Sequence, residues 1–177
     1  QGGPIDIFGV GERLITSKSD PVFGAVYKIA SIEKDGMWEP RIKISESVEK
    51  ITNPGLKKVY RVYNDKGRAI ADLLTLLREV PDTEEPYRYI DPEQPWRELY
   101  FENCTFKEMK QLIIKDGKLV VDLPTLEEIR AYVQDQLANE IWPEEQRFEN
   151  PHRHYLDMSP SYYQLKMDLL NRIYRKK

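Results

Sequence analysis

Alternation of apolar and polar residues predicts short strands in the first half of the chain. Residues 25–33 (AVYKIASIE) alternate, and turn residues follow them at positions 34–36. Residues 39–45 (EPRIKIS) alternate strictly, with Ile42 and Ile44 expected on the buried side. These patterns predict two neighbouring strands joined by a turn.

A longer pair of strands is predicted next along the chain. The runs KKVYRVY and RAIADLLTL flank residues 64–67, which predicts a β-hairpin with a longer loop. Just before it, TNPG at residues 52–55 is typical of a type II turn, because proline presets φ and glycine accepts a positive φ. We therefore expect residues 25–77 to be rich in strands.

Residues 78–97 interrupt this pattern with four prolines and many acidic side chains. We expect a connecting segment here rather than a further strand. Three aromatic residues, Tyr87, Tyr89 and Trp96, are expected to anchor this connector by packing against the rest of the protein.

The second half of the chain predicts one more hairpin and two helices. Residues 105–124 contain an Asp-Gly turn between apolar runs, which predicts the hairpin. Thr125 and Glu128 have the spacing of a capping box at the start of a helix. Ser159 followed by Pro160 predicts the start of the last helix, with proline at its first position.

Each predicted helix carries one apolar stripe. The stripes consist of Leu126, Ile129, Val133, Leu137 and Ile141 in the first helix, and of Leu165, Leu169, Leu170 and Ile173 in the second. Pro143 is expected to end the first helix. Because an apolar stripe needs a cover, we expect the two helices to pack against each other, with the hairpin strand Lys118–Asp122 between them as the alternative.

The start of the chain contains a candidate ligand site. Ile5, Ile7 and Phe8 predict a short buried strand, and Gly9 and Gly11 follow where it should end. Two glycines in three residues allow positive φ and the close approach of a ligand to the backbone. Backbone N–H groups in such a turn can hold a phosphate, and a tight strand exit without any ligand is the alternative.

Composition and charge exclude several classes of protein. The 177 residues carry a net charge of −3, which argues against a nucleic-acid binder because such proteins usually have a basic excess. No apolar run reaches the roughly 18 residues of a membrane span, and no signal peptide opens the sequence. Cys104 is the only cysteine, so a reducing cytoplasm is the expected location. Because no initiator Met is present and a lone strand needs partners, we interpret the chain as the C-terminal part of a longer protein.

Single residues give weaker signals for chemistry. His152 and His154 lie two residues apart, a spacing that suits a metal, but the chain has no third histidine, so loop histidines without a special role are favoured. Cys104 has no histidine near it in sequence, which favours a buried thiol over a nucleophile.

Cationic side chains gather around the TNPG turn and could complement a phosphate. They are Lys43, Lys50, Lys57 and Arg61, with Ser45 among them. Solvated side chains on the outer face of a sheet are the alternative, and composition alone favours it.

Long motifs connect these segments to one family. They are IDIFGVGERLITS followed by PVFGAVYKIASIE, then RIKISESVEKITNPGLKKVYRVYNDKGRAIADLL, LPTLEEIRAYVQDQL and SPSYYQLKMDLLNRIY. In this order and spacing the chain resembles the nicotinate phosphoribosyltransferase family over essentially its whole length. The resemblance implies transfer of a phosphoribosyl group from 5-phosphoribosyl 1-diphosphate to the ring nitrogen of nicotinate, with coupled ATP hydrolysis, in NAD biosynthesis.

The resemblance also implies an architecture and partners. It implies an α/β protein, α+β in this part of the chain. Residues 1–36 end an irregular α/β barrel, residues 37–98 form a β-rich segment with a proline-rich connector, and residues 99–177 form a C-terminal domain of a hairpin and two helices. The implied ligands are nicotinate, 5-phosphoribosyl 1-diphosphate, ATP and Mg²⁺. The implied assembly is a cytoplasmic homodimer without a nucleic-acid or membrane partner.

The resemblance assigns the ribose 5-phosphate to the backbone of Gly9, Val10, Gly11 and Glu12. Arg13, Thr16 and Lys43 are candidate supporting residues. Many relatives carry threonine where this chain has Glu12, and a carboxylate facing phosphate is repelled by more than about 1 kcal/mol. We therefore expect only the N–H of Glu12 to contact the ligand.

No catalytic residue is assigned to this chain. The phosphorylated histidine and the main nicotinate-binding arginine of the family are expected upstream of residue 1, and neither His152 nor His154 matches that histidine. A non-catalytic phosphate-binding or structural interaction module is therefore the alternative function.

Overall fold

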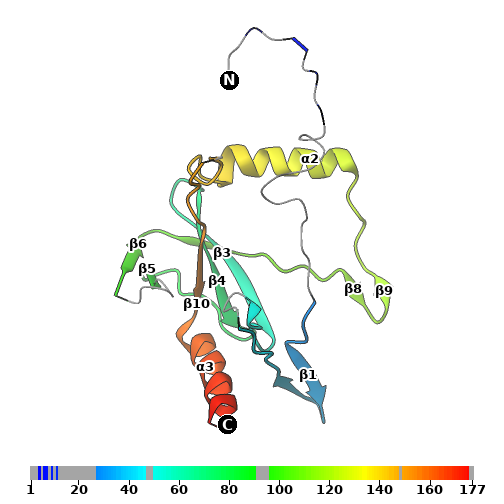
Figure 1. The fold of residues 1–177 in the computed structure, drawn as a ribbon, viewed down its shortest axis with the longest axis vertical. Helices are drawn as coiled ribbons and strands as arrows, with labels where there is room; N and C mark the ends of the chain where they lie inside the picture. The colour runs from blue at the N-terminus through cyan, green and yellow to red at the C-terminus, as the bar shows by residue number, and fades with distance from the viewer. Residues whose placement is uncertain are drawn as a thin grey trace.

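The computed structural model describes residues 4, 6, 7, 9, 11, 27–46, 50–90, 96–147 and 149–175 of the chain. Its centre is a four-stranded sheet with the strand order β10–β4–β3–β7 (Figure 1). These strands are β3 Lys57–Tyr63, β4 Ala69–Leu76, β7 Thr105–Glu108 and β10 Tyr155–Met158. β3 runs antiparallel to β4 and β7, whereas β10 lies parallel to β4.

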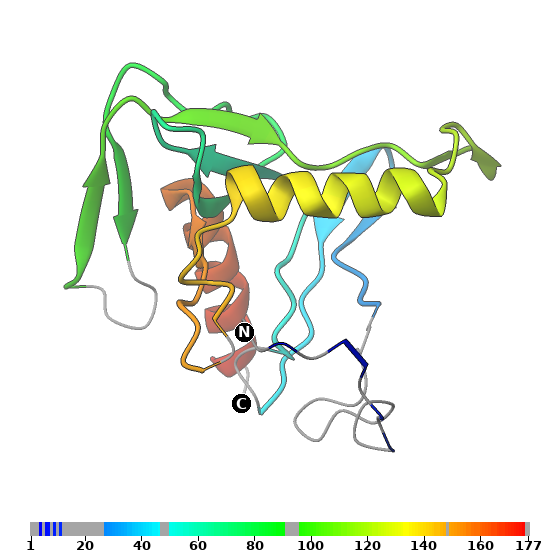
Figure 2. The same cartoon turned by 90° about the horizontal axis from the view of Figure 1, so that it is seen from above.

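Three two-stranded hairpins and two helical segments surround the central sheet. The hairpins are β1 Ser31–Lys34 with β2 Met37–Pro40, β5 Tyr87–Ile90 with β6 Glu98–Phe101, and β8 Ile114–Lys115 with β9 Lys118–Leu119. The helical segments are α2 Leu126–Asp135, which continues into the π-helix η2 Gln136–Glu140, and α3 Pro160–Tyr174. Figure 2 shows the β5–β6 and β8–β9 hairpins at opposite edges of the molecule, with α2 running between them.

The β3–β4 hairpin confirms the strongest strand prediction. In its register Tyr60 lies opposite Leu73, and Arg61 lies opposite Asp72. The side-chain oxygen of Asn64 accepts hydrogen bonds from the backbone N–H groups of Lys66 at 3.0 Å and Arg68 at 2.9 Å. An asparagine side chain that accepts hydrogen bonds from backbone N–H groups two to four residues later stabilises a loop that has no strand hydrogen bonds of its own.

The hydrophobic core lies between the central sheet and the β5–β6 hairpin. Its buried residues are Tyr60, Val62, Ile70, Ala71, Leu73, Tyr87, Tyr89 and Cys104. Tyr87 and Tyr89 are therefore buried as predicted, but Trp96 is 80% exposed and does not anchor the segment. The prediction of a connector over residues 78–97 is also wrong in part, because the sequence YRYI alternates inward and outward and forms β5.

The two strands predicted before residue 46 are shorter than expected. β1 begins only at Ser31, and β2 ends at Pro40, so residues 41–45 are not a strand. The backbone of Lys43 instead exchanges hydrogen bonds with Thr52, which draws this segment toward the TNPG turn. Ile42 and Ile44 alternate with polar residues because their side chains are half-buried beside α3, and not because the segment is a strand in a sheet.

Both helices begin where the sequence predicts, but they do not form a pair. Thr125 and Glu128 make a complete capping box, and Ser159 caps α3 with Pro160 at the first turn. Figure 1 shows α2 and α3 at opposite ends of the central sheet. The predicted packing of their stripes is wrong, because α3 packs instead against β4 and the turn at Gly55.

The predicted strand at residues 5–8 falls largely outside the described residues. The described members, Asp6 and Ile7, have no regular secondary structure, and the side chain of Ile7 is 87% exposed. The prediction of a buried strand is therefore wrong for Ile7 in this chain. A strand needs a neighbour for its backbone hydrogen bonds, and no described strand lies beside these residues.

The described residues form a mixed α/β fold with open sheets, and none of the described sheets closes into a barrel. The central sheet takes β3 and β4 from residues 37–98 and takes β7 and β10 from residues 99–177. The division into three domains stays a prediction. None of the helices in the described ranges is both long enough and apolar enough to cross a membrane.

Candidate functional site

The predicted phosphate loop lies only partly within the described residues. Gly9 and Gly11 are exposed, and a Cβ atom added at either position would meet no other atom within 4 Å. Val10, Glu12, Arg13 and Thr16 lie outside the described residues. The open space at both glycines is compatible with a ligand approaching the backbone, and the site itself stays a prediction.

The TNPG turn adopts the predicted backbone conformation and is tied to neighbouring segments. Gly55 has a φ of +81°, and its N–H donates a 2.7 Å hydrogen bond to the carbonyl of Ala30. Thr52 accepts a hydrogen bond from the N–H of Lys43 through its hydroxyl and returns one from its own N–H, both at 3.2 Å. The turn thus joins the segment before β1, the segment around Lys43 and the start of β3.

Two lysines converge on the Asn53 residue of this turn. The Lys57 ammonium donates to the carbonyl oxygens of Asn53 at 2.9 Å and Gly55 at 3.3 Å. The Lys166 ammonium, from α3, donates to the side-chain oxygen of Asn53 at 2.8 Å. Burial lowers the pKa of both lysines, and the nearby Lys110 lowers that of Lys57 further. Lys57 therefore holds the turn together, which explains its place in the cationic cluster without a ligand.

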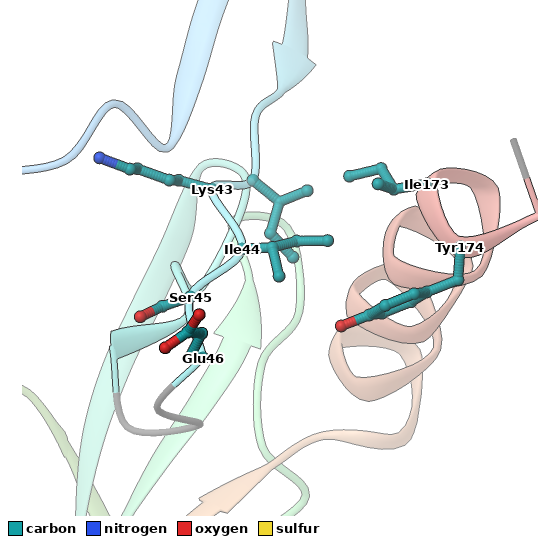
Figure 3. A pocket seen from close by; sticks show the side chains of 7 residues that line it. Lys43, Ile44, Ser45, Glu46, Ile173 and Tyr174 are labelled. Carbon is teal, nitrogen blue, oxygen red and sulfur yellow. The ribbon is translucent and has the colours of Figure 1, made fainter. Parts of the chain in front are cut away.

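An open groove of about 570 Å³ lies next to this turn, between the segment at Lys43 and the C-terminal end of α3 (Figure 3). Figure 3 shows Ile44 facing Ile173 and Tyr174 across the groove, while Lys43 extends away from α3. The groove is therefore mainly apolar at its centre. The structure does not direct the Lys43 ammonium into it, and the supporting role of Lys43 toward a phosphate stays a prediction.

Arg61, another member of the predicted cationic cluster, is neutralised by Asp72. Its guanidinium donates two hydrogen bonds to the Asp72 carboxylate, at 2.9 and 3.2 Å. Burial acts to raise the pKa of Asp72, but the His154 ring 3.6 Å away and the two hydrogen bonds from Arg61 outweigh it and lower that pKa to about 2. Arg61 therefore forms an ion pair with Asp72 across the β3–β4 hairpin, and its guanidinium is already engaged rather than available to a phosphate.

His154 extends this ion pair into a four-residue group that we call the His154 network, formed by Arg61, Asp72, Glu145 and His154. The Nδ1 atom of His154 lies 3.1 Å from Glu145 Oε1, and its Nε2 atom lies 3.6 Å from Asp72 Oδ1. The Asp72 carboxylate beside the ring raises the pKa of His154 against the opposing effect of burial, although at 3.6 Å it does not hydrogen-bond Nε2, which has no hydrogen-bond partner among the described residues. His154 lies outside the helices and strands, as predicted for a loop histidine, and the acidic side chains of Asp72 and Glu145 lie beside its ring.

The remaining candidates have structural surroundings. His152 is exposed and sets its ring edge against Tyr155 at a centroid distance of 5.2 Å. Cys104 is buried in the core, and burial raises the pKa of its thiol, which suits the predicted inert role. Within the described ranges no group of three or more His, Cys, Asp or Glu residues is placed to hold a metal ion.

Sequence reasoning missed one further paired group. The Tyr87 hydroxyl donates a 2.8 Å hydrogen bond to Asp157, and burial raises the pKa of both side chains. The only sequence signal was the alternation around Tyr87, which predicts burial but not a partner 70 residues away. These paired groups join segments that lie far apart in the sequence.

Comparison with known proteins identifies the family. A family model described as the nicotinate phosphoribosyltransferase C-terminal domain matches residues 56–166. The nicotinate phosphoribosyltransferase of Bacillus subtilis is 35% identical over 98% of this chain, and that of Caenorhabditis elegans is 34% identical over 90%. The human nicotinic acid phosphoribosyltransferase structure shares the fold with a TM-score of 0.58 and 24% identity, over 66% of this chain and 23% of that chain.

The matches leave most of each relative unaccounted for. The chain spans 35% of the length of the Bacillus subtilis protein and 28% of that of the Caenorhabditis elegans protein. The family match itself covers all four strands of the central sheet, α2 and the beginning of α3. The chain therefore belongs to the nicotinate phosphoribosyltransferase family, of which it carries the C-terminal domain.

Proposed function

We propose that this chain is the C-terminal part of an enzyme that forms nicotinate mononucleotide from nicotinate and 5-phosphoribosyl 1-diphosphate. In this reaction the ring nitrogen of nicotinate bonds to C1 of the ribose, and the bond between C1 and the diphosphate breaks. Diphosphate leaves with the bonding electrons, and coupled ATP hydrolysis drives the reaction. The observation that carries the proposal is the match to relatives of this name over 98% and 90% of the chain.

Within that enzyme, we assign Gly9, Val10, Gly11 and Glu12 to the ribose 5-phosphate. Backbone N–H groups bind an anion without side-chain bulk, and the open space at both glycines supports this assignment. We propose that Glu12 contributes only its backbone N–H, because a carboxylate facing a phosphate is repelled. Arg13, Thr16 and Lys43 are supporting residues of this proposed site.

The other ligands are assigned to parts of the enzyme beyond the described residues. Mg²⁺ and ATP are proposed as ligands of the whole enzyme, as the family resemblance implies. We further propose a homodimer in the cytoplasm, as the family resemblance implies. The described residues of this chain then act as a scaffold that supports the phosphate loop.

An activity assay tests the proposed function. The full-length protein is incubated with nicotinate, 5-phosphoribosyl 1-diphosphate, ATP and Mg²⁺, and nicotinate mononucleotide and diphosphate are quantified. We expect both products in equal amounts, and none when nicotinate is left out. The 177-residue chain alone is expected to give none. A full-length protein without this activity contradicts the proposal.

A non-catalytic structural module is the second candidate function. The observation that favours it is that Asp72, Tyr87 and His154, whose pKa values the fold shifts, each bond to another side chain. Groups already paired inside the protein are not free to act on a ligand. Product formation by the full-length protein decides against this candidate as the function of the whole.

A further inference from the structure

The most prominent uncovered surface within the described residues is the apolar side of α2. We call it the α2 stripe; it consists of Leu126, Ile129, Val133 and Leu137, whose side chains are 44–63% exposed. No residue of α2 is buried. A helix of this length is marginal in water unless its apolar face is packed, and such a face rimmed by polar residues marks an interaction site.

The structure holds the α2 stripe in a fixed position. At its N-terminal end the capping box of Thr125 and Glu128 satisfies the first turn. At the other end the ring N–H of Trp142 donates a 2.8 Å hydrogen bond to the carbonyl of Ala69, and Arg68 donates one of 2.9 Å to the carbonyl of Ile141. These bonds attach the end of the helical segment to the beginning of β4. The stripe is thus a preformed surface rather than one that must fold on contact.

The size of the stripe argues against a second copy of this chain as its cover. A stable dimer interface usually buries about 1,200–2,000 Å² and takes about 20 to 30 residues from each side. Four side chains along one short helix provide only a small part of such an area. A surface of this size suffices when both sides belong to one polypeptide, because the tether keeps them at high effective concentration.

The lengths of the relatives supply a cover of this kind. This chain matches 35% of the Bacillus subtilis relative and 28% of the Caenorhabditis elegans relative, so most of each relative lies outside the match. A further set of apolar side chains, just before α2 in the chain, is also exposed: Leu112, Ile114, Leu119 and Leu123. The exposure of both groups of apolar side chains is expected if this segment packs against another part of a longer polypeptide.

We propose that the α2 stripe docks onto the catalytic part of the same polypeptide, the part that precedes this segment in the relatives. The inference rests on the proposed function, because it takes the unmatched part of the relatives as the catalytic part. The docked stripe fixes the C-terminal domain against the body that holds the proposed phosphate loop.

Site-specific photo-cross-linking in the full-length protein tests this contact. The photoreactive residue p-benzoylphenylalanine is placed at Val133, within the stripe, or at the exposed Ala131 on the other side of α2 as the matched control. After irradiation, denaturing gels separate cross-links within one chain from those between chains, and mass spectrometry maps the joined peptides. We expect the photoreactive residue at position 133 to form a cross-link to a peptide upstream of Gln1 in the same chain. The same residue at position 131 should not form this cross-link.

Each other outcome overturns the proposal. These outcomes are a cross-link between two chains, one confined to residues 1–177, equal products from both positions, and a natural chain that begins at Gln1. A second variant pair gives an independent readout: Val133→Asp should lower the melting temperature of the full-length protein more than Ala131→Asp, and equal effects contradict docking. The nicotinate assay on the same samples tests the two proposals separately. A protein that forms the cross-link but has no activity contradicts only the proposed function. A protein that is active but forms no cross-link contradicts only the docking of the α2 stripe.

Discussion

The phenolic O–H of Tyr162 donates a 2.9 Å hydrogen bond to the carbonyl oxygen of Pro54, 108 residues earlier in the chain. The Tyr162 side chain is fully buried, so this bond satisfies a carbonyl that water does not reach. It joins the first turn of α3 to the TNPG turn, next to the point where Lys166 reaches Asn53. The contact explains how a proline-glycine turn keeps one conformation beside a helix.

Replacement of this tyrosine is expected to destabilise the fold. Tyr162→Phe keeps the ring but leaves the Pro54 carbonyl without its donor, which should cost about 1–3 kcal/mol in the free energy of unfolding. Urea denaturation of the variant measures this change. Tyr163→Phe is the matched control, because Tyr163 is its exposed neighbour in the same helix and should change the free energy little. Equal effects of both substitutions would show that the buried hydrogen bond is not stabilising.

The His154 network predicts a dependence of stability on pH. The pKa of His154 is raised in the fold, so its stabilising effect is complete below its unfolded value of 6.5 and disappears as the pH rises through the folded pKa. His154→Gln should therefore lower the free energy of unfolding more at about pH 5.5 than at about pH 8.5. His152→Gln, at an exposed ring, is the control and should show no such difference. A loss that is the same at both pH values contradicts the prediction.

Asp72 acts in the opposite direction on the pH scale. Its pKa falls to about 2 in the fold, so its contribution is present above the unfolded value of 3.8 and is lost as the pH drops toward 2. Asp72→Asn should therefore make the acid limb of the unfolding curve shallower between those values. Glu102→Gln, at an exposed position, serves as the control. If the acid limb of the Asp72→Asn variant is unchanged, the Asp72 carboxylate does not contribute to stability at acid pH.

The proposed phosphate loop is tested by Gly11→Val in the full-length enzyme. A Cβ atom added at this position meets no described atom within 4 Å, so the effect of the substitution should fall on the ligand rather than on the fold. We expect the KM for 5-phosphoribosyl 1-diphosphate to rise about tenfold or more, because the side chain blocks approach to the backbone. The KM for nicotinate is the internal control. Unchanged kinetics for the phosphoribosyl donor would exclude the loop as its phosphate site.

Core and stripe positions should respond differently to the same truncation. Leu73→Ala in the central sheet should cost about 2–5 kcal/mol, because Leu73 is buried. Leu137→Ala should cost less than about 1 kcal/mol in the 177-residue chain, because Leu137 is 44% exposed there. Chemical denaturation of both variants provides the comparison. A large loss from Leu137→Ala in this chain would mean that the stripe is already covered by residues 1–177.

The elements predicted correctly are those that short sequence signals determine. The Asn64 loop, the positive φ of Gly55, the capping box at Thr125 and the Ser159 cap each depend on residues within four positions. The hairpin of β3 and β4 follows from its two long apolar runs. Such local interactions act in the unfolded chain as well, so the sequence reveals them directly.

The wrong predictions depend on contacts between distant residues. Alternation at Ile42 and Ile44 resembles a strand, but the pairing of Lys43 with Thr52 and the position of α3 decide the outcome. A helical stripe indicates that a cover is needed and does not identify the cover, which is why the packing of α2 on α3 was wrong. At the candidate site, charge alone could not distinguish Arg61, which Asp72 neutralises across the hairpin, from a cation free to meet phosphate.

The parallel pairing of β10 with β4 sets the order in which the sheet can be completed during translation. Tyr155 pairs with Ala71 and Met158 pairs with Leu74, so the ribosome makes β10 well after its partner β4. Until then one edge of β4 has unpaired backbone groups, and an open edge can pair with another chain. Residues 155–175 should therefore protect the newly made protein from aggregation. A premature stop codon before Tyr155 is consequently expected to yield insoluble material rather than a smaller folded domain.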